Sequence, residues 1–203
     1  MSEPLPISEE IRDAMQEICN VAMGAAGESL ALFSGVFVEL PIPKIRFVKP
    51  QVVTEALAGL RGEDKISAVM QSFAMGETPN NQALVAITET GLNDLAQQRG
   101  VALESPDDAM ALLKELATVI VDNCLPHIAE QLELDNLTQG ELQTVAASQL
   151  LENVQIPEIV GGGHLLTAEI NYHLEGHPFN CDLLLLMPEA GLERTIERLQ
   201  RLL

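Results

Sequence analysis

Aromatic residues are nearly absent from this sequence, which has no tryptophan, one tyrosine and five phenylalanines. Hydrophobic residues still make up 47% of the 203-residue chain, so the core must be built from aliphatic side chains. A chain of this length can bury enough apolar surface for a well-filled core, and we expect residues 1–203 to form one domain.

Basic residues are also scarce, since eleven lysines and arginines stand against thirty acidic residues and give a net charge of −19. Such a charge repels phosphate backbones and anionic lipid surfaces, so we expect neither nucleic acid nor membrane as a partner. Solubility is a sufficient explanation of the charge, and a protein partner with a basic face stays open.

Long hydrophobic runs are missing as well. The longest apolar stretch, Leu183–Met187, is far shorter than the roughly 20 residues that span a bilayer. The first ten residues have neither a basic start nor an apolar stretch. We therefore expect a cytoplasmic protein.

Cysteine and histidine do not form a recognised cross-linking or metal-binding pattern. The cysteines are odd in number, widely spaced and set in apolar surroundings, which predicts buried thiols: Cys19, Cys124 and Cys181. Three histidines lack the carboxylate or cysteine spacing that completes a metal site: His164, His173 and His177. We expect no metal and no cofactor of the protein's own.

Hydrophobic periodicity divides the chain into two similar halves. Helical patterns cover Ser8 to Ser34, with Ser8 as N-cap and Gly35 as the stop, and Glu89 to Arg99. In the second half they run from Pro106 to about Leu134 and from Glu189 to Leu203. The β-type stretches lie near Val36–Glu39, Lys44–Val48, Ile66–Met75, Ala83–Thr88, Leu142–Ala147, Leu165–Leu174 and Cys181–Met187.

The two halves also match residue by residue near their ends. Gly76, Leu84, Glu89, Gly91 and Leu92 correspond at one constant offset to Gly176, Leu184, Glu189, Gly191 and Leu192. The match predicts an α+β fold made of a duplicated α-β-β-β-α unit, with repeats at about 8–100 and 106–203. We expect one largely antiparallel central sheet, long helices packed on it, and pseudo-twofold symmetry.

The segment Gln149–Gly163, which ends in three glycines, is predicted to be a loop. A phosphate cradle is the alternative interpretation of these glycines. A strand pattern follows them, however, and such a cradle requires a helix N-terminus.

The first helix carries a polar stripe formed by Asp13, Glu17, Asn20 and Gly24, at positions i, i+4, i+7 and i+11. The stripe lies off the apolar face of the helix. It presents two carboxylates, one amide and a residue without a side chain, so another molecule's backbone could approach closely beside Asn20. A solvated helix face would explain the first three residues equally well.

A specific motif favours a functional stripe: an acid or serine, three residues, Glu, two residues, Asn, twenty-two residues, Pro. Asp13, Glu17, Asn20 and Pro43 satisfy every position. With the duplicated architecture and the sequence ALFSGVFVELPIPKIRFV, which leads from the helix into the first strands, the chain resembles the CheC/CheX/FliY chemotaxis phosphatase family over nearly its whole length.

The resemblance implies hydrolysis of an aspartyl phosphate on a CheY-like receiver domain of a response regulator. The receiver supplies its own Mg²⁺ and a lysine that contacts the phosphoryl group. Asn20 would orient the attacking water, and Glu17 would pair with that lysine. The family also implies a possible homodimer and a possible receptor deamidase (CheD-like) partner.

The chain departs from the family pattern at Cys19 and in its second half. Cys19 stands where the family usually has glycine. Because it neighbours Ile18 on the apolar side of the predicted helix, we favour a packing role over a redox role. In the second half Glu115 is kept, but Ala111, Thr118 and Glu141 replace the acid, the amide and the proline, so we expect this second site to be inactive.

A substitute pair, Glu133 with Asn136, lies at a predicted helix end and lacks the other motif residues, so we do not expect it to act. The competing function is a non-catalytic, flagellar-switch-type module that binds receivers or partner subunits. A small-molecule sensor or scaffold is a third reading, because a fold alone does not determine function.

Overall fold

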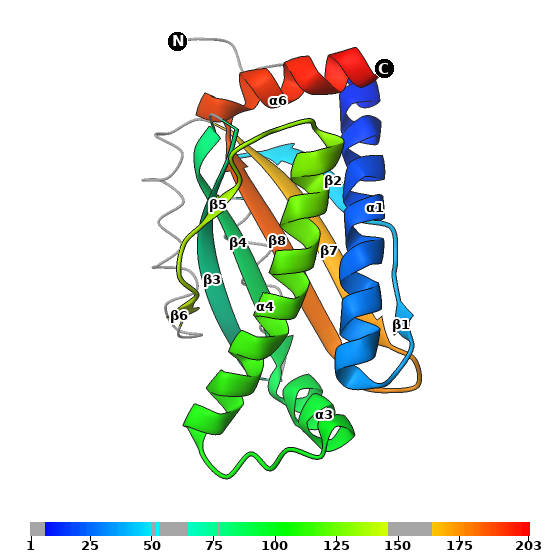
Figure 1. Ribbon diagram of the computed structural model, residues 1–203, viewed down its shortest axis with the longest axis vertical. Helices are drawn as coiled ribbons and strands as arrows, with labels where there is room; N and C mark the ends of the chain where they lie inside the picture. The colour runs from blue at the N-terminus through cyan, green and yellow to red at the C-terminus, as the bar shows by residue number, and fades with distance from the viewer. Residues whose placement is uncertain (1–6, 50–51, 53–64, 77, 146–163) are drawn as a thin grey trace.

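The computed structural model describes residues 7–49, 52, 65–76, 78–145 and 164–203 (Figure 1). The described elements are α1 (Glu9–Ser34), β1 (Val38–Glu39), β2 (Lys44–Val48), β3 (Ile66–Met75), β4 (Thr78–Thr88), α3 (Glu89–Arg99), α4 (Pro106–Gln131), β5 (Thr138–Gln139), β6 (Gln143–Val145), β7 (Leu165–Leu174), β8 (Asn180–Pro188) and α6 (Glu189–Leu202). The predicted α+β class is confirmed. The predicted loop Gln149–Gly163 lies outside the described residues.

Local capping chemistry sets the ends of α1 as predicted. The Ser8 hydroxyl accepts a hydrogen bond from the backbone N–H of Ile11. At the other end Gly35 adopts φ 75°, and its N–H donates to the carbonyl of Ala31. Glycine reaches this left-handed conformation without the steric cost that a Cβ atom brings, which stops the helix there.

Helix α4 ends three residues earlier than its hydrophobic pattern indicates. A capping box between Ser105 and Asp108 begins it as the sequence predicts, but it ends at Gln131. Glu133 has φ 51°, so the chain turns away although Leu132 and Leu134 continue the apolar periodicity. Both leucines pack against the core from the turn that follows the helix.

One eight-stranded antiparallel sheet combines both halves, in the order β1-β7-β8-β4-β3-β5, with β2 also paired to β7 and β6 to β3. The short strands β1 and β2 of the first half thus pair with the second half, and β5 and β6 pair with the first. Each half therefore completes the sheet of the other. Each half has four described strands, one more than in the predicted α-β-β-β-α unit, and β5 is a short edge strand that the sequence pattern did not predict.

The pseudo-twofold axis passes between β4 and β8. These strands pair antiparallel with Leu84 opposite Leu184, two residues that are equivalent in the two halves. The equivalent turns at Gly76 and Gly176 have φ 59° and 74°. The internal sequence match therefore corresponds to a structural repeat.

Helices α1 and α4 lie side by side on one face of the sheet, while α6 and α3 lie at opposite ends of the molecule (Figure 1). Alternate strand residues point at these helices, for example Val85, Ile170 and Leu183, which are fully buried. Burying one such side chain contributes about 1.5–3 kcal/mol. The core thus holds α1 rigidly and leaves its opposite face exposed.

All three cysteines are buried free thiols, as predicted. They lie around the buried Tyr172 on α1, α4 and β8. Burial raises the pKa of the Cys19 thiol and raises that of Cys124 to about 12. A protonated, inaccessible thiol is a poor nucleophile, so the packing interpretation of Cys19 is the one that the structure favours.

Candidate functional site

The polar stripe of α1 lies on the solvent-facing side of the helix. Asp13, Glu17 and Asn20 are exposed, whereas Ile18 and Cys19 on the opposite side are buried. Gly24 continues the stripe, and a Cβ atom added there would meet nothing within 4 Å among the described residues. The stripe is thus open to a partner at Asn20 and Gly24.

The residues of the stripe differ in their interactions. Asp13 accepts a hydrogen bond from the Arg12 guanidinium at 3.1 Å, which together with Glu9 at 3.3 Å raises the pKa of Arg12. Neither Glu17 nor Asn20 forms an ion pair or side-chain hydrogen bond within the described part of the chain. A carboxylate and a carboxamide, one helical turn apart, therefore remain available for a ligand.

Pro43 is buried directly before β2, at the end of the segment 35–43 that returns along α1 (Figure 1). In this segment Leu40 packs on Gly27, with Leu40 Cδ1 3.0 Å from where a Gly27 Cβ atom would stand. Gly27 lies on the line of the stripe, three residues beyond Gly24. The segment therefore closes the stripe at its C-terminal end and leaves Gly24 open.

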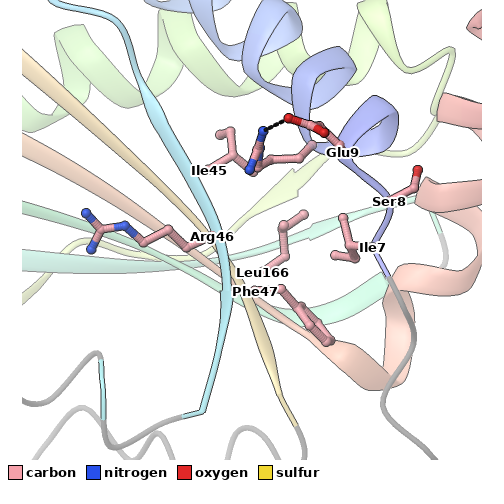
Figure 2. Close-up of a pocket in the computed structure, with 8 residues that line it drawn as sticks. Ile7, Ser8, Glu9, Ile45, Arg46, Phe47 and Leu166 are labelled. Atoms are coloured by element: carbon pink, nitrogen blue, oxygen red, sulfur yellow. Dashed lines mark hydrogen bonds and ion pairs between the residues drawn. The ribbon is translucent and has the colours of Figure 1, made fainter.

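A pocket of about 280 Å³ lies at the other end of α1, between the start of the helix and β2 (Figure 2). Its lining residues are Ile7, Ser8, Glu9, Arg12, Ile45, Arg46, Phe47 and Leu166. Glu17 and Asn20 are not among them. The candidate site is an exposed helix face outside this pocket, which suits contact with a protein partner.

The corresponding residues of α4 are also exposed, but two of them have partners within the protein. Glu115 forms an ion pair with Arg99 at 3.6 Å. Arg99 also donates to the carbonyl of Phe33 at 3.0 Å, and its guanidinium lies 3.7 Å from the centre of the Phe33 ring. The Thr118 hydroxyl donates to the Lys114 carbonyl at 2.9 Å, and Ala111 offers no polar group. Sequence reasoning missed Arg99, because nothing local relates it to Glu115.

The pair Glu133 and Asn136 lies beyond the end of α4, with φ values of 51° and 64°. These residues do not share a helix face, so they cannot reproduce the geometry of the α1 stripe. Glu133 instead contacts Arg198 of α6 at 3.3 Å.

The histidines are separated in the structure. His164 lies 3.4 Å from a carboxylate oxygen of Glu189, and His177 lies 3.1 Å from Asp94. Within the described residues, no group of three or more His, Cys, Asp or Glu side chains is placed to hold a metal ion. Likewise, no described helix is long and apolar enough to cross a bilayer.

No protein-family model matches the sequence, and no curated protein matches it either. Solved structures do match the fold. FliY from Thermotoga maritima has 16% identity and a TM-score of 0.68, over 96% of this chain and 98% of that chain. A chain of the FliM–SpeE complex from H. pylori has 10% identity and a TM-score of 0.66, over 97% of both chains.

A chain of the CheX–CheY–BeF3–Mg²⁺ complex from Borrelia burgdorferi has 9% identity and a TM-score of 0.52, over 83% of this chain and 96% of that chain. At these identities the likeness concerns the fold. The duplicated unit, the single antiparallel sheet and the paired long helices thus agree with the resemblance inferred from the motif on α1: the chain has the CheC/CheX/FliY family fold.

Proposed function

We propose that this protein accelerates hydrolysis of the aspartyl phosphate of a CheY-like response regulator. The observation that carries the proposal is the contrast between the two long helices. All four residues are exposed, but Glu17 and Asn20 have no side-chain partner among the described residues, whereas Glu115 pairs with Arg99 and the Thr118 hydroxyl donates to its own helix backbone. The family fold and the likeness to a chain crystallised with CheY, BeF3 and Mg²⁺ support it further.

Asn20 orients the attacking water in this proposal. Its neutral carboxamide can accept from and donate to water, and so hold it in line with the phosphorus without introducing a charge that repels the phosphoryl oxygens. Its position on a helix anchored by the core fixes that geometry before the partner arrives.

Glu17 pairs with the receiver lysine that contacts the phosphoryl group. One helical turn separates Glu17 from Asn20, so an ion pair at Glu17 holds Asn20 at a set distance from the reacting centre. The Mg²⁺ that neutralises phosphoryl charge belongs to the receiver as part of the substrate. A homodimer and a deamidase partner stay predictions from the family resemblance.

The direct test is loss of phosphate from purified phospho-receivers, with and without this protein, in the presence of Mg²⁺. We expect the wild-type protein to speed the loss from at least one receiver of the same organism. Unchanged decay for every receiver would contradict the proposal.

A non-catalytic binding module of the flagellar-switch type is the second candidate. The observation that favours it is the likeness to a chain of the FliM–SpeE complex, whose TM-score of 0.66 exceeds the 0.52 of the CheX-complex chain. This candidate predicts receiver or partner-subunit binding without accelerated hydrolysis, so the same assay combined with a binding measurement separates the two.

A further inference from the structure

Three aliphatic side chains around the α1 stripe remain exposed to solvent. Val21 is 43% exposed, Leu40 36% and Ile42 71%. We call Val21, Leu40 and Ile42 the apolar rim. Exposed aliphatic residues are individually common, but several beside one polar pair can exclude water from that pair when a partner covers them.

The rim lies on both sides of the stripe. At 100° per residue, Gly27, on which Leu40 packs, lies about 20° around the helix axis from Asn20, and Val21 lies about 100° to the other side. Asn20 and Gly24 consequently lie between Val21 and Leu40. The stripe is a polar strip with apolar flanks.

From the position of Leu40 at Gly27, we infer that Ile42 lies near the level of Asn20 and Gly24 along the helix. The segment runs from Leu40, at Gly27, to Ile45, which lines the pocket with Ser8 at the start of α1. An extended chain rises about 3.3 Å per residue and a helix about 1.5 Å. The two residues from Leu40 to Ile42 therefore cover about the same length as four residues of α1, which brings Ile42 about four residues before Gly27. Figure 1 shows this segment running back beside α1.

We propose that the apolar rim docks the receiver domain on the surface around its phosphorylated aspartate, and so sets receiver affinity separately from the rate of hydrolysis. This inference rests on the proposed function. Continuity with Glu17 and Asn20 commits the rim to the same partner, since a molecule that reaches Asn20 must cover the flanks. Apolar contacts there exclude water from the Glu17 ion pair, which strengthens it.

Charge supports the same occupant. Glu17, Glu28 and Glu39 are exposed on α1 and on the segment that carries the rim. A receiver site that presents a lysine and a divalent cation complements these carboxylates. A second copy of this chain, with its net charge of −19, would bring the same acidic surface against itself.

The test uses the full chain and a receiver loaded with beryllofluoride and Mg²⁺, which fixes the bound state without turnover. Affinity is measured for the wild type, Val21→Ser and Ile42→Ser, with Leu32→Ser as matched control. Leu32 is 82% exposed on the same helix, about 18 Å along the axis from Asn20. Single-turnover hydrolysis at saturating protein and thermal melting are measured for each variant.

We expect each rim variant to weaken receiver binding about fivefold to tenfold, with melting and the saturated hydrolysis rate unchanged, and Leu32→Ser to bind like the wild type. Wild-type affinity in both rim variants would overturn the inference, even if Asn20→Ala abolished hydrolysis and the proposed function stood. Loss of wild-type self-association in the rim variants, with receiver affinity unchanged, would overturn it in favour of a second copy as the occupant. A wild-type protein that neither binds nor dephosphorylates any receiver would overturn the proposed function together with the inference.

Discussion

Gly24 lowers the stability of α1 but leaves room beside Asn20 for a partner. It lies within α1, where glycine is less favourable than alanine by about 0.5–1 kcal/mol, and the space beside it is open. No packing or backbone requirement among the described residues explains the glycine. A partner that approaches closely would explain it.

We therefore expect Gly24→Ala to raise the free energy of unfolding by about 0.5–1 kcal/mol, measured by urea denaturation. Gly24→Leu should keep the fold but weaken binding of the beryllofluoride-loaded receiver, because its side chain occupies the approach to Asn20. A destabilised Gly24→Ala would show that the fold itself requires glycine here, and a Gly24→Leu that binds normally would show that the partner does not use the open space.

Glu115 provides the matching experiment in the other half of the chain. We expect Glu115→Ala to leave receiver dephosphorylation nearly unchanged and to cost at most about 1 kcal/mol of stability, because the Glu115 carboxylate is 60% exposed and Arg99 keeps its contacts with Phe33. Abolished hydrolysis in a folded Glu115→Ala protein would refute the assignment of a single site.

Glu17→Ala should lower both receiver affinity and turnover, and raised salt should weaken the wild-type complex in the same direction.

The polar stripe could be predicted residue by residue because it depends on one helix. Spacing along α1 is enough to place Asp13, Glu17 and Asn20 on one face. Leu40 and Arg99 could not be predicted in the same way, since their contacts with Gly27 and Glu115 join segments whose register depends on tertiary packing.

At the level of elements, the core joins α1, α4 and the sheet around a cluster of thiols. Cys19, Cys124 and Cys181 come from three different elements and surround Tyr172, whose hydroxyl has no hydrogen bond of good geometry among the described residues. Burial disfavours the thiolate and phenolate forms and raises the pKa of all four groups.

These raised pKa values predict a loss of stability at alkaline pH. A thiol ionises near its ordinary pKa of 9.0 in the unfolded chain, whereas Cys124 in the folded protein does so at about 12. The contribution of the protonated thiol to the free energy of unfolding is therefore fully present below pH 9. It falls as pH rises towards 12, by about 1.4 kcal/mol per pH unit for each thiol.

The measurement is urea denaturation at pH 8 to 10.5 for the wild type and Cys124→Ala. The variant loses packing at every pH, but its slope with pH should be shallower by one ionising group. Equal slopes would mean that Cys124 is not protected from ionisation in the folded state.

Element boundaries were predictable where local chemistry sets them. The caps predicted at Ser8 and Gly35 place both ends of α1, α4 begins at Pro106 as predicted, and β2, β3 and β7 have the predicted bounds. The end of α4 was predicted three residues late, because Leu132 and Leu134 keep the helical period while the backbone at Glu133 turns into positive φ. Apolar periodicity reports burial, which a turn packed on the core can also provide.

At the scale of the whole molecule, the fold is symmetric but the equivalent helices α1 and α4 present different side chains. The twofold relation between Leu84 and Leu184 fixes equivalent backbones, so α1 and α4 face solvent in similar positions. The repeat could be inferred from the sequence. The pairing of β1 and β2 with the second half, and of β5 and β6 with the first, could not be inferred, because strand pairing between distant segments leaves no local pattern.

The central claim is that Asn20 orients the water that attacks the phosphoryl group. The most direct measurement is single-turnover hydrolysis of a phospho-receiver by the wild type and by Asn20→Ala, with receiver affinity and melting as controls. Asn20→Ala should slow hydrolysis by roughly two to three orders of magnitude, while affinity is largely kept and stability changes by no more than about 0.5 kcal/mol. Hydrolysis by Asn20→Ala at the wild-type rate would contradict the mechanism and favour the non-catalytic binding module.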